Sequence, residues 1–525
     1  MQDTVNAKIR ESSEKSVNFY HIMAFTAMVF GMFMAILDIQ IVSASLAEIQ
    51  AGINASPDEI SWIQTSYLIA EVIMIPISGF LTRLMSTRVF FTISAAGFTF
   101  ASILCATATS IEGMIIARAL QGFIGGGMIP SVFAVAFTIF PASKRNIVSS
   151  LIGLVATLAP TIGPTIGGYL SQVFSWHWLF LVNLPPGIII SIAAWKLINF
   201  DKSDSSLMAK FDWWGLISMA TFLGSLEYIL EEGPRNGWMD DKLICLFTTL
   251  MFVGASVFFW RAFTLKEPII DLKIFSNLNF AMGSLFSFVM GIGLYGLTYM
   301  YPLYLSRIRD YDALMIGKTM LISGFTMFLS APLAGFLANH IDLRLMIASG
   351  FIGFAISTWI VTGLTVEWDF WELFYAQILR GISLMLCMVP INNIALCTLP
   401  LSCIKNAASL FNLMRNLGGA VGLTMINTVL MNRVDFHYAR IAEAIHWGRA
   451  EVCNMMFQLS SRFDLPNVDS HLRVLQFVTN IVSQQATVMA FSDAFLLLTF
   501  LFSVLTILVL TIKKPQDVLN SRNFH

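Results

Sequence analysis

Charged side chains are scarce in this sequence: Asp, Glu, Lys and Arg together make up 12% of its 525 residues. Soluble globular proteins carry about 25% charged residues, so the scarcity excludes an ordinary soluble domain. Hydrophobic residues make up 56% of the chain. Fourteen membrane-spanning helices of about 20 residues each would need about 280 apolar positions, and the chain has enough. The composition therefore predicts an integral membrane protein.

Several catalytic and binding patterns are also missing. The six cysteines form no CxxC pair, so nothing indicates a metal site or a disulfide framework. Gly317-Lys318-Thr319 resembles the end of a nucleotide-binding loop, but position 312 is Asp where that loop begins with Gly. None of the seven His residues lies in an HExxH motif, and a net charge of −1 gives no indication of nucleic-acid binding. We therefore expect a protein that is not an enzyme, uses no cofactor or metal and binds no nucleic acid.

Long apolar runs predict fourteen membrane-spanning helices. They lie at residues 19–46, 58–81, 88–109, 112–138, 146–173, 178–199, 213–231, 243–263, 277–304, 313–338, 344–365, 371–398, 404–431 and 488–512. The polar residues 1–18 lack the pattern of a cleaved signal peptide, so we expect the first span to remain as an anchor. The predicted all-α organisation is a tail at 1–18, a six-helix bundle at 19–199, a two-helix insertion at 200–270, a second six-helix bundle at 271–512 and a tail at 513–525.

The distribution of Lys and Arg predicts the orientation. Most of the 31 Lys and Arg residues lie in segments on the same side as the two tails. Four short connections on the other side, near residues 47–57, 110–111, 174–177 and 366–370, carry none. Arg307 and Arg309 go against this trend. Because basic loops tend to stay in the cytoplasm, we expect both termini to be cytoplasmic.

An internal repeat divides the chain into two halves. Residues 79–81 (GFL) recur as residues 335–337, and Arg88 has Arg344 as its counterpart at the same offset. Ala117, Leu120 and Gly122 recur as Ala376, Leu379 and Gly381. Six further residues also recur in order: Pro141, Ser143, Ser150, Leu151, Leu154 and Gly163 have as counterparts Pro400, Ser402, Ser409, Leu410, Leu413 and Gly422. Two homologous bundles of this length are typical of secondary transporters.

Six short motifs occur in order along the chain. They are LDIQIV at 37–42, GFL at 79–81, ARALQG at 117–122, LAPTIGPTIGG at 158–168, WHWLFLVNLPPG at 176–187 and RNLGG at 415–419. Together they resemble the motifs of the fourteen-span drug–proton antiporters of the major facilitator superfamily, most closely those of the EmrB-like proteins. The resemblance extends over about residues 20–512 and implies the major facilitator fold, with two six-helix bundles and two extra central helices.

This resemblance also implies a function and its partners. We expect proton-coupled export of hydrophobic or amphipathic compounds by alternating access, through the inner membrane of a bacterial cell and in contact with its lipid. A periplasmic membrane-fusion adaptor and an outer-membrane channel are the implied protein partners. The alternative on the same fold is a secondary exporter of a specific metabolite, siderophore or fatty acid.

The stretch at 158–168 resembles the antiporter motif of the family's fifth helix. Pro160 and Pro164 should each remove a backbone hydrogen bond and bend that helix. Gly163 and Gly167 leave one face without side chains, which a neighbouring helix can approach closely, and Gly168 completes the motif. Ordinary helix packing would account for the same glycines, so both interpretations remain open.

Ionisable residues inside the apolar spans are the candidates for proton coupling: Asp38, Glu71, Arg118 and Glu227. A charged side chain near the middle of a bilayer costs about 2.5–3.5 kcal/mol on insertion scales, so each needs a partner or a function. Burial raises the pKa of a carboxyl group and a nearby arginine lowers it, so a group held between these effects can exchange protons. A structural ion pair is the alternative for Asp38 and Arg118, and contact with the membrane surface is the alternative for Glu227.

Five other arginines are assigned to gating or structure: Arg83, Arg88, Arg344, Arg380 and Arg415. The first three flank the two copies of an inner-loop motif in which the family usually has Asp and then Gly. The first copy departs from that pattern, with Arg83 and Ser86 at these positions, and the second has Asn339 and Asp342.

One predicted connection, at residues 432–487, is much longer than the others. Most helix connections have fewer than about 12 residues. Apolar residues at helical spacing, among them Ile441, Ile445, Val452, Met456 and Leu459, predict short amphipathic helices on the outer face. The loop is then either a cap over the exit or a docking surface for the periplasmic adaptor.

Overall fold

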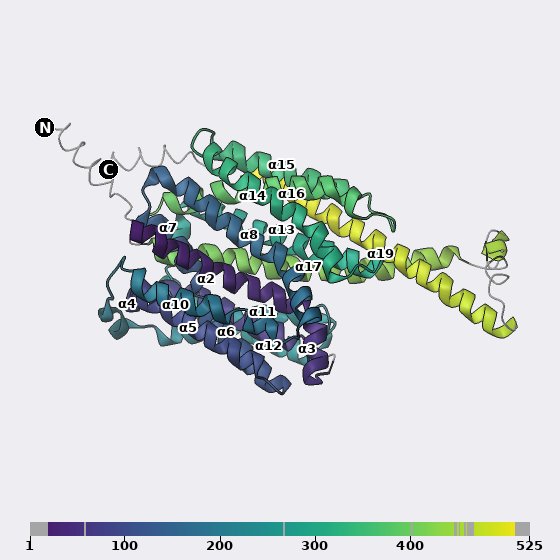
Figure 1. Ribbon diagram of the computed structural model, residues 1–525, viewed down its shortest axis with the longest axis horizontal. Coiled ribbons are helices and arrows are strands. Elements are labelled where there is room, and N and C mark those ends of the chain that lie inside the picture. Colours follow the sequence, from purple (N-terminus) through teal and green to yellow (C-terminus); the bar gives the residue numbers. More distant parts are fainter. Residues whose placement is uncertain are drawn as a thin grey trace.

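The computed structural model describes residues 19–56, 59–265, 268–400, 403–445, 449–450, 452–455, 458 and 467–509. All regular elements within these ranges are helices. Twelve stretches in this part of the chain are helical and are long and apolar enough to cross a membrane. They run side by side in an elongated bundle (Figure 1).

The helices fall into two halves joined by an insertion. The first half contains α2 (Phe19–Ala44), α3 (Leu46–Ile53), α4 (Trp62–Met85), α5 (Thr87–Ala106), α6 (Ile111–Gly125), α7 (Met128–Ile139), α8 (Ala142–Val173), α9 (Trp178–Leu181) and α10 (Leu184–Leu197). The insertion contains the 3-10 helix η1 (Ser205–Lys210), α11 (Trp213–Glu232), η2 (Trp238–Asp240), α12 (Lys242–Thr264) and η3 (Leu272–Ser276). The second half contains α13 (Leu278–Arg309), α14 (Ala313–Leu337), α15 (Leu343–Val361), α16 (Phe370–Cys397), α17 (Ile404–Ala444) and α19 (Asn467–Leu508).

Acidic side chains in the short loops define where several helices begin. Asp241 and Asp312 accept hydrogen bonds from backbone N–H groups in the first turns of α12 and α14. Asp369 and Glu372 form a reciprocal capping box at the start of α16. These side chains satisfy N–H groups that have no partner inside the helix, so each apolar helix begins directly after its short polar loop.

Two helices outside the twelve apolar stretches complete the bundle. α11 packs on α4 and α12, and α17 packs on α13, α4 and α19. With them, the described residues contain fourteen long helical stretches, in the predicted arrangement of two bundles of six with two additional helices. The predicted fold class is therefore confirmed.

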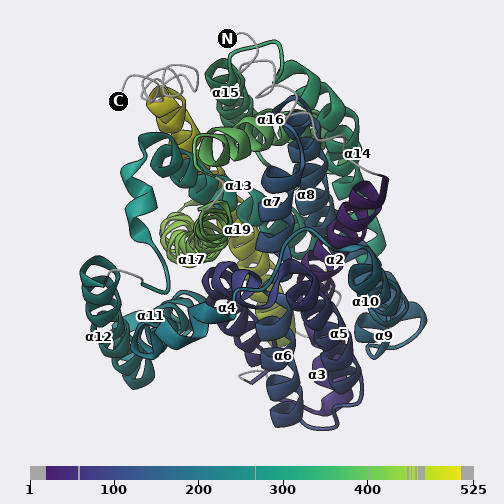
Figure 2. The same ribbon diagram turned by 90° about the vertical axis from the view of Figure 1, so that its left-hand side faces the viewer.

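The two halves meet through reciprocal contacts that follow the repeat (Figure 2). A Cβ atom on Gly79 of α4 would lie 2.8 Å from Ser409 Oγ on α17. A Cβ atom on Gly335 of α14, the counterpart of Gly79, would lie 2.9 Å from Ser150 Oγ on α8. Ser150 and Ser409 are themselves counterparts, so each half presents a glycine where the serine of the other half approaches.

Contacts between the two halves occur near one end of the bundle. We call the end at which α2 begins and α19 ends the terminal end, and the opposite end the distal end (Figure 1). Side-chain hydrogen bonds join the two halves near the terminal end, between Ser149 and Asn393 at 2.9 Å and between Ser78 and Ser409 at 3.1 Å. The halves are thus held together at the terminal end.

Two predicted spans are interrupted. The span at 112–138 divides into α6 and α7 at Gly126 and Gly127, and the span at 178–199 divides into α9 and α10. The Gly126 position packs tightly against α4, because a Cβ atom there would lie 3.1 Å from the Glu71 backbone oxygen. α10 begins with Pro185 and Pro186 in its first turn, where proline is tolerated.

The predicted extent of the loop at 432–487 is wrong. α17 continues to Ala444 and α19 begins at Asn467, so both helices extend past the rest of the bundle at the distal end (Figure 1). Ile441 and Ile445 on this side pack against a buried cluster of Val474, Val478 and Val482. The apolar spacing therefore serves mainly to hold two long helices together, and Val452, in a short helical stretch at 452–455, also packs on this cluster. Met456 and Leu459 lie outside the described residues.

Candidate functional site

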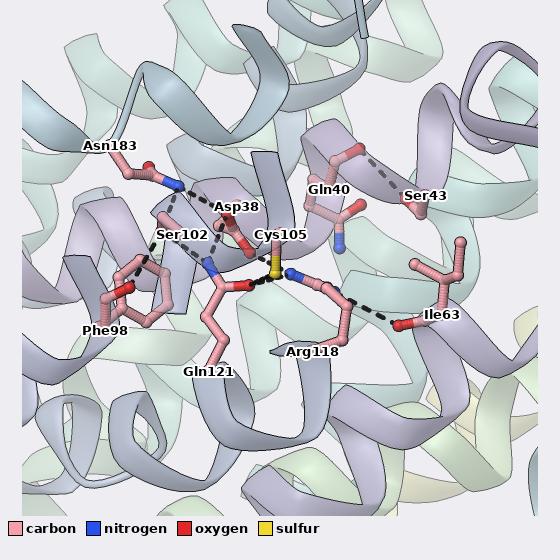
Figure 3. A network of polar contacts seen from close by, with 10 residues as sticks. All are labelled: Asp38, Gln40, Ser43, Ile63, Phe98, Ser102, Cys105, Arg118, Gln121 and Asn183. Carbon is pink, nitrogen blue, oxygen red and sulfur yellow. Dashed lines mark hydrogen bonds and ion pairs between the residues drawn. The ribbon is translucent and has the colours of Figure 1, made fainter. Parts of the chain in front are cut away.

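A buried ion pair lies inside the first half of the bundle. Asp38 is on α2 and Arg118 is on α6, and both side chains have 0% exposure. Arg118 Nη1 lies 2.6 Å from Asp38 Oδ2 (Figure 3). The structure thus brings together two of the four predicted coupling residues.

The other oxygen of the Asp38 carboxylate accepts hydrogen bonds from two amides (Figure 3). Asn183, between α9 and α10, donates through Nδ2 at 2.6 Å, and Gln121 on α6 donates through Nε2 at 3.1 Å. Gln121 also donates to Ser102 Oγ on α5 at 2.8 Å and accepts from Arg118 at 2.6 Å. The hydrogen-bond network around this carboxylate therefore links α2, α5, α6 and the turn between α9 and α10.

The donors around Asp38 indicate its charge. An ionised carboxylate only accepts hydrogen bonds, whereas a protonated one must donate from one of its oxygens. Arg118 donates to one oxygen, and Asn183 and Gln121 donate to the other. This arrangement suits the ionised form, and a proton on either oxygen would face an N–H group.

Arg118 is also held by α4. Its Nε donates to the backbone oxygen of Ile63 at 3.3 Å, and its Cζ lies 4.2 Å from the centre of the Tyr67 ring. A guanidinium over an aromatic face gains cation–π attraction. A change in the charge of Asp38 would therefore alter the electrostatic environment of Arg118, which contacts three helices.

Glu71 lies one turn beyond Tyr67 on α4. Its side chain contacts α17 and is not part of the Asp38 network. It has 1% exposure, and its Oε2 accepts a hydrogen bond of 3.4 Å from Asn416 Nδ2 on α17. Glu71 therefore faces the other half of the protein, whereas Asp38 lies within one half. No ion pair with Glu71 is formed by the described residues.

Glu227 lies on α11, in the insertion. It is buried, with 4% exposure, so the alternative that it reaches the surface is not what the structure shows. α11 also contacts the second half, where Thr424 Oγ1 of α17 donates to the backbone oxygen of Leu230 at 2.6 Å. Glu227 is thus near the boundary between the insertion and both halves, apart from the Asp38 network.

The antiporter motif on α8 packs against α2 next to Asp38. A Cβ atom on Gly163 would lie 2.4 Å from Gln40 Cβ, and one on Gly167 would lie 2.8 Å from the backbone oxygen of Ile41. The expected close helix approach is therefore present. α8 continues as a helix through Pro160 and Pro164, and the backbone oxygen of Gly168 accepts a bond from Ser171.

The second half contains an altered copy of the Asp38 site. Gln377 and Arg380 are the repeat counterparts of Arg118 and Gln121, so Arg and Gln have exchanged places. Arg380 has 0% exposure, and its Nη2 donates to Thr298 Oγ1 on α13 at 2.7 Å. α13 is the first helix of the second half, as α2 is the first helix of the first half. The neutral hydroxyl of Thr298 on α13 therefore takes the place that the Asp38 carboxylate has on α2. No described residue forms an ion pair with Arg380.

The remaining predicted arginines lie away from Asp38. Arg415 on α17 stands 4.8 Å from the centre of the Phe133 ring on α7, between the two halves. At the terminal end, Arg83 is in the last turn of α4, Arg88 lies 5.0 Å from the Trp195 ring centre, and Arg344 pairs with Asp342 at 3.2 Å.

Sequence reasoning missed four polar side chains at these sites: Ser102, Gln121, Asn183 and Asn416. Three of them stand inside the motifs ARALQG, WHWLFLVNLPPG and RNLGG, so an uncharged polar residue in an apolar span was the available signal. Ser102 carried no such signal, because serines in membrane helices often bond their own backbone. Its hydroxyl does so here, with Phe98 O at 3.0 Å, while it also accepts from Gln121.

Comparisons with known proteins agree with this architecture. The sequence matches the family model of the Major Facilitator Superfamily over residues 28–423. It is 40% identical to the colistin resistance protein EmrB of Acinetobacter baumannii over 486 residues, which is 93% of this chain and 95% of that protein. It is 26% identical to the multidrug export protein EmrB of Escherichia coli, over 92% of this chain and 93% of that protein.

A solved structure shows the same fold. The human organic anion transporter MFSD10 superposes with a TM-score of 0.57 at 13% sequence identity, covering 92% of this chain and 99% of that one. The family match, the relatives and the two-bundle architecture lead to one conclusion: this chain belongs to the major facilitator superfamily, within its EmrB-like branch.

Proposed function

We propose that this chain is a proton-coupled multidrug exporter that moves hydrophobic or amphipathic compounds by alternating access. The observation that carries this proposal is the fully buried Asp38 carboxylate, which Arg118 and two amides surround with donors. The relatives named for colistin resistance and multidrug export cover nearly the whole chain. They support drugs as the substrates and export as the direction.

The Asp38 network supplies a way to couple a proton to helix movement. Protonation of Asp38 cancels the negative charge that faces Arg118, and an uncompensated charge in a buried position is strongly unfavourable. Arg118 must then change its contacts with α4 and α6. Release of the proton restores the pair and the earlier packing. Each cycle thus takes up and releases one proton at this carboxylate, while substrate moves in the opposite direction.

Glu71 and Glu227 are proposed as further coupling residues, with different places in the cycle. Glu71 bonds Asn416 across the two halves, so this contact must change when the halves move relative to each other. Glu227 lies on α11, which contacts both α4 and α17. Both carboxylates are therefore at boundaries that alternating access would rearrange.

We place the protein in the bacterial inner membrane with both termini in the cytoplasm, because basic residues are concentrated on that side. The terminal end is then the cytoplasmic end. The two halves are joined there by Ser149 with Asn393 and by Ser78 with Ser409. We therefore propose that this conformation is closed on the cytoplasmic side.

The extended parts of α17 and α19 are the proposed docking site for a periplasmic membrane-fusion adaptor, which would lead to an outer-membrane channel. They project from the distal end (Figure 1) and carry exposed apolar side chains, including Phe436, Leu475, Phe477 and Ile481. Such side chains on a projecting element are typical of a contact surface. The alternative is a lid that acts only on this protein's own exit.

Transport in everted membrane vesicles tests the proposed function. Substrate uptake should follow an imposed proton gradient and collapse when an uncoupler is added, even with ATP present. Uptake that requires ATP and survives the uncoupler would contradict the proposal. A panel of structurally unrelated drugs, fatty acids, siderophores and metabolites then separates a multidrug exporter from one that accepts a single metabolite.

Shortening the projecting helices tests the adaptor. Replacement of residues 436–484 by a short Gly/Ser linker leaves the ion pair of Arg433 and Asp493, at 2.5 Å, to join α17 and α19. Drug uptake in vesicles should persist, while resistance of intact cells should be lost. Full resistance after the replacement would assign these helices to a lid.

A further inference from the structure

Arg380, inside the second half, has N–H groups that neutral side chains satisfy only in part. An arginine remains charged in proteins and has five N–H donors. Its Nη2 donates to Thr298 Oγ1 at 2.7 Å and its Nη1 donates to Gln377 Oε1 at 3.3 Å. Its Nε has no hydrogen-bond partner within the part of the chain that the structure describes. The guanidinium is thus fully buried and bonded to neutral groups.

A second unpaired donor lies on the facing helix. Thr298 and Tyr301 are three residues apart and share one face of α13, and the Tyr301 ring centre lies 5.4 Å from Arg380 Cζ. Tyr301 has 1% exposure. Its hydroxyl lies near Ser357, but it makes no hydrogen bond of ordinary length and direction with the described residues. Buried donors without a partner are rare and costly, so two of them where α13 meets α16 indicate a ligand that accepts hydrogen bonds.

The internal repeat indicates the charge of that ligand. In the first half, the buried Arg118 has the Asp38 carboxylate on the first helix of its bundle. At the matching place in the second half, Thr298 Oγ1 donates its proton to the backbone oxygen of Leu294 at 2.7 Å. The Thr298 hydroxyl can therefore accept from Arg380, but it brings no negative charge.

The contacts of Arg380 reduce the cost of burial without cancelling its charge. The Tyr301 ring gives cation–π attraction, and Tyr301 is also the ionisable side chain that interacts with Arg380. An un-ionised phenol adds no charge. Because a buried charge without an opposite charge is strongly unfavourable, a negatively charged ligand would complete this site.

We propose that Arg380 and Tyr301 form a binding site for a small monovalent anion inside the second half. The anion accepts hydrogen bonds from Arg380 Nε and from the Tyr301 hydroxyl, and it replaces the carboxylate that the first half has in Asp38. Free chloride and the carboxylate of a transported compound share this chemistry. Such a site can exist whether or not transport is coupled to protons.

Thermal unfolding of the full-length protein in detergent tests the site without measuring transport. The protein is purified in sodium gluconate, whose anion is much larger than chloride, and is titrated with sodium chloride at constant ionic strength. We expect the melting temperature to rise by about 2 °C or more and then level off, because a ligand of the folded state stabilises it in a saturable way.

A parallel titration with sodium octanoate distinguishes the two sources of the anion. A lower half-saturating concentration for chloride assigns the site to a free halide, and a lower one for octanoate assigns it to the carboxylate of a transported compound. A melting temperature that responds to neither anion would overturn the site.

Arg380→Met should make the melting temperature independent of both anions. Thr298→Asp should have the same effect, because a carboxylate on α13 would replace the bound anion. The matched control is Arg415→Met, which removes another buried arginine of the second half that forms no ion pair with the described residues and should keep the response. A full response in Arg380→Met, or an equal loss in Arg415→Met, contradicts the proposal.

Tyr301→Phe keeps the ring beside Arg380 and removes only the hydroxyl. It should raise the half-saturating concentration of the anion about tenfold, the lower end of the effect expected for a hydrogen bond to a charged group. If Arg380→Met does not fold, Tyr301→Phe and Thr298→Asp decide the question. A weaker response with Phe and none with Asp supports the site, and an unchanged half-saturating concentration in either variant contradicts it.

Discussion

Gly163 on α8 lies against Gln40 on α2, at a separation that would leave a Cβ atom of residue 163 only 2.4 Å from Gln40 Cβ. Gln40 follows Asp38 by two residues on the same helix. The antiporter motif and the buried carboxylate therefore act on one segment of α2. The space at Gly163 sets the position of the helix that carries Asp38.

Gly163→Leu should block transport, whereas Gly153→Leu on the same helix should be tolerated. A Cβ atom on Gly153 would meet Met388 Cβ at 3.5 Å, an ordinary contact, while Gly163 has no such room. Overpacking of this kind costs about 1–3 kcal/mol, here at the helix that carries Asp38. Initial rates in vesicles, normalised to the amount of protein in the membrane, compare the two variants. Equal losses would reduce the motif to general helix packing.

Asp38→Asn and Arg118→Met should each destabilise the protein as well as abolish coupled transport. Removal of one partner leaves the other as an uncompensated buried group, at a cost of about 3–5 kcal/mol. The double variant should regain much of the lost melting temperature in detergent and still fail to transport. A double variant as unstable as the two losses combined would show that the residues do not act as a pair.

Glu71→Gln should remove the response of transport to the proton gradient with little change in stability. The glutamine oxygen can still accept the bond from Asn416, so only the titratable group is lost. Substrate uptake measured over a series of imposed pH gradients should become flat. Glu112→Gln at the exposed start of α6 is the control and should leave the response intact. A normal response in Glu71→Gln removes this residue from the coupling mechanism.

Thr298→Asp should stabilise the second half, because it would place a carboxylate within reach of Arg380. Thr298 Oγ1 already accepts from Arg380 at 2.7 Å, and hydrogen bonds between charged groups contribute about 1.5–3 kcal/mol. Thr298→Asn has nearly the same shape without the charge. The melting temperature should rise with Asp relative to Asn. A lower value with Asp would indicate that Arg380 has no need of a counterion in this position.

The helical architecture could be predicted from the sequence because lipid demands long apolar helices. The same rule explains the main error, at residues 432–487. Outside the membrane a helix no longer has to be apolar, so the polar ends of α17 and α19 resembled a loop. The spacing of Ile441 and Ile445 correctly indicated a helix. Spacing alone, however, does not show that this helix is the continuation of a membrane span.

The candidate site could be predicted only in part. Asp38 and Arg118 were found because a charge in an apolar span is rare. Asn183 and Gln121, which form hydrogen bonds with this pair, were not predicted as its partners. A neutral amide in an apolar span indicates a functional site less strongly than a charge does. The contact between Arg380 and Thr298 was beyond prediction, since a threonine is an ordinary residue of a membrane helix, and only the packing of α16 on α13 brings the two together.

The complete burial of Asp38 has a consequence for the membrane that houses the protein. With 0% exposure, this acid is insulated from water on both faces of the bilayer in the conformation described here. In the proposed mechanism, an idle copy would therefore not short-circuit the proton gradient on which the rest of the cell depends. The close packing around Asp38 would then prevent leakage, and protons would pass only when helices move.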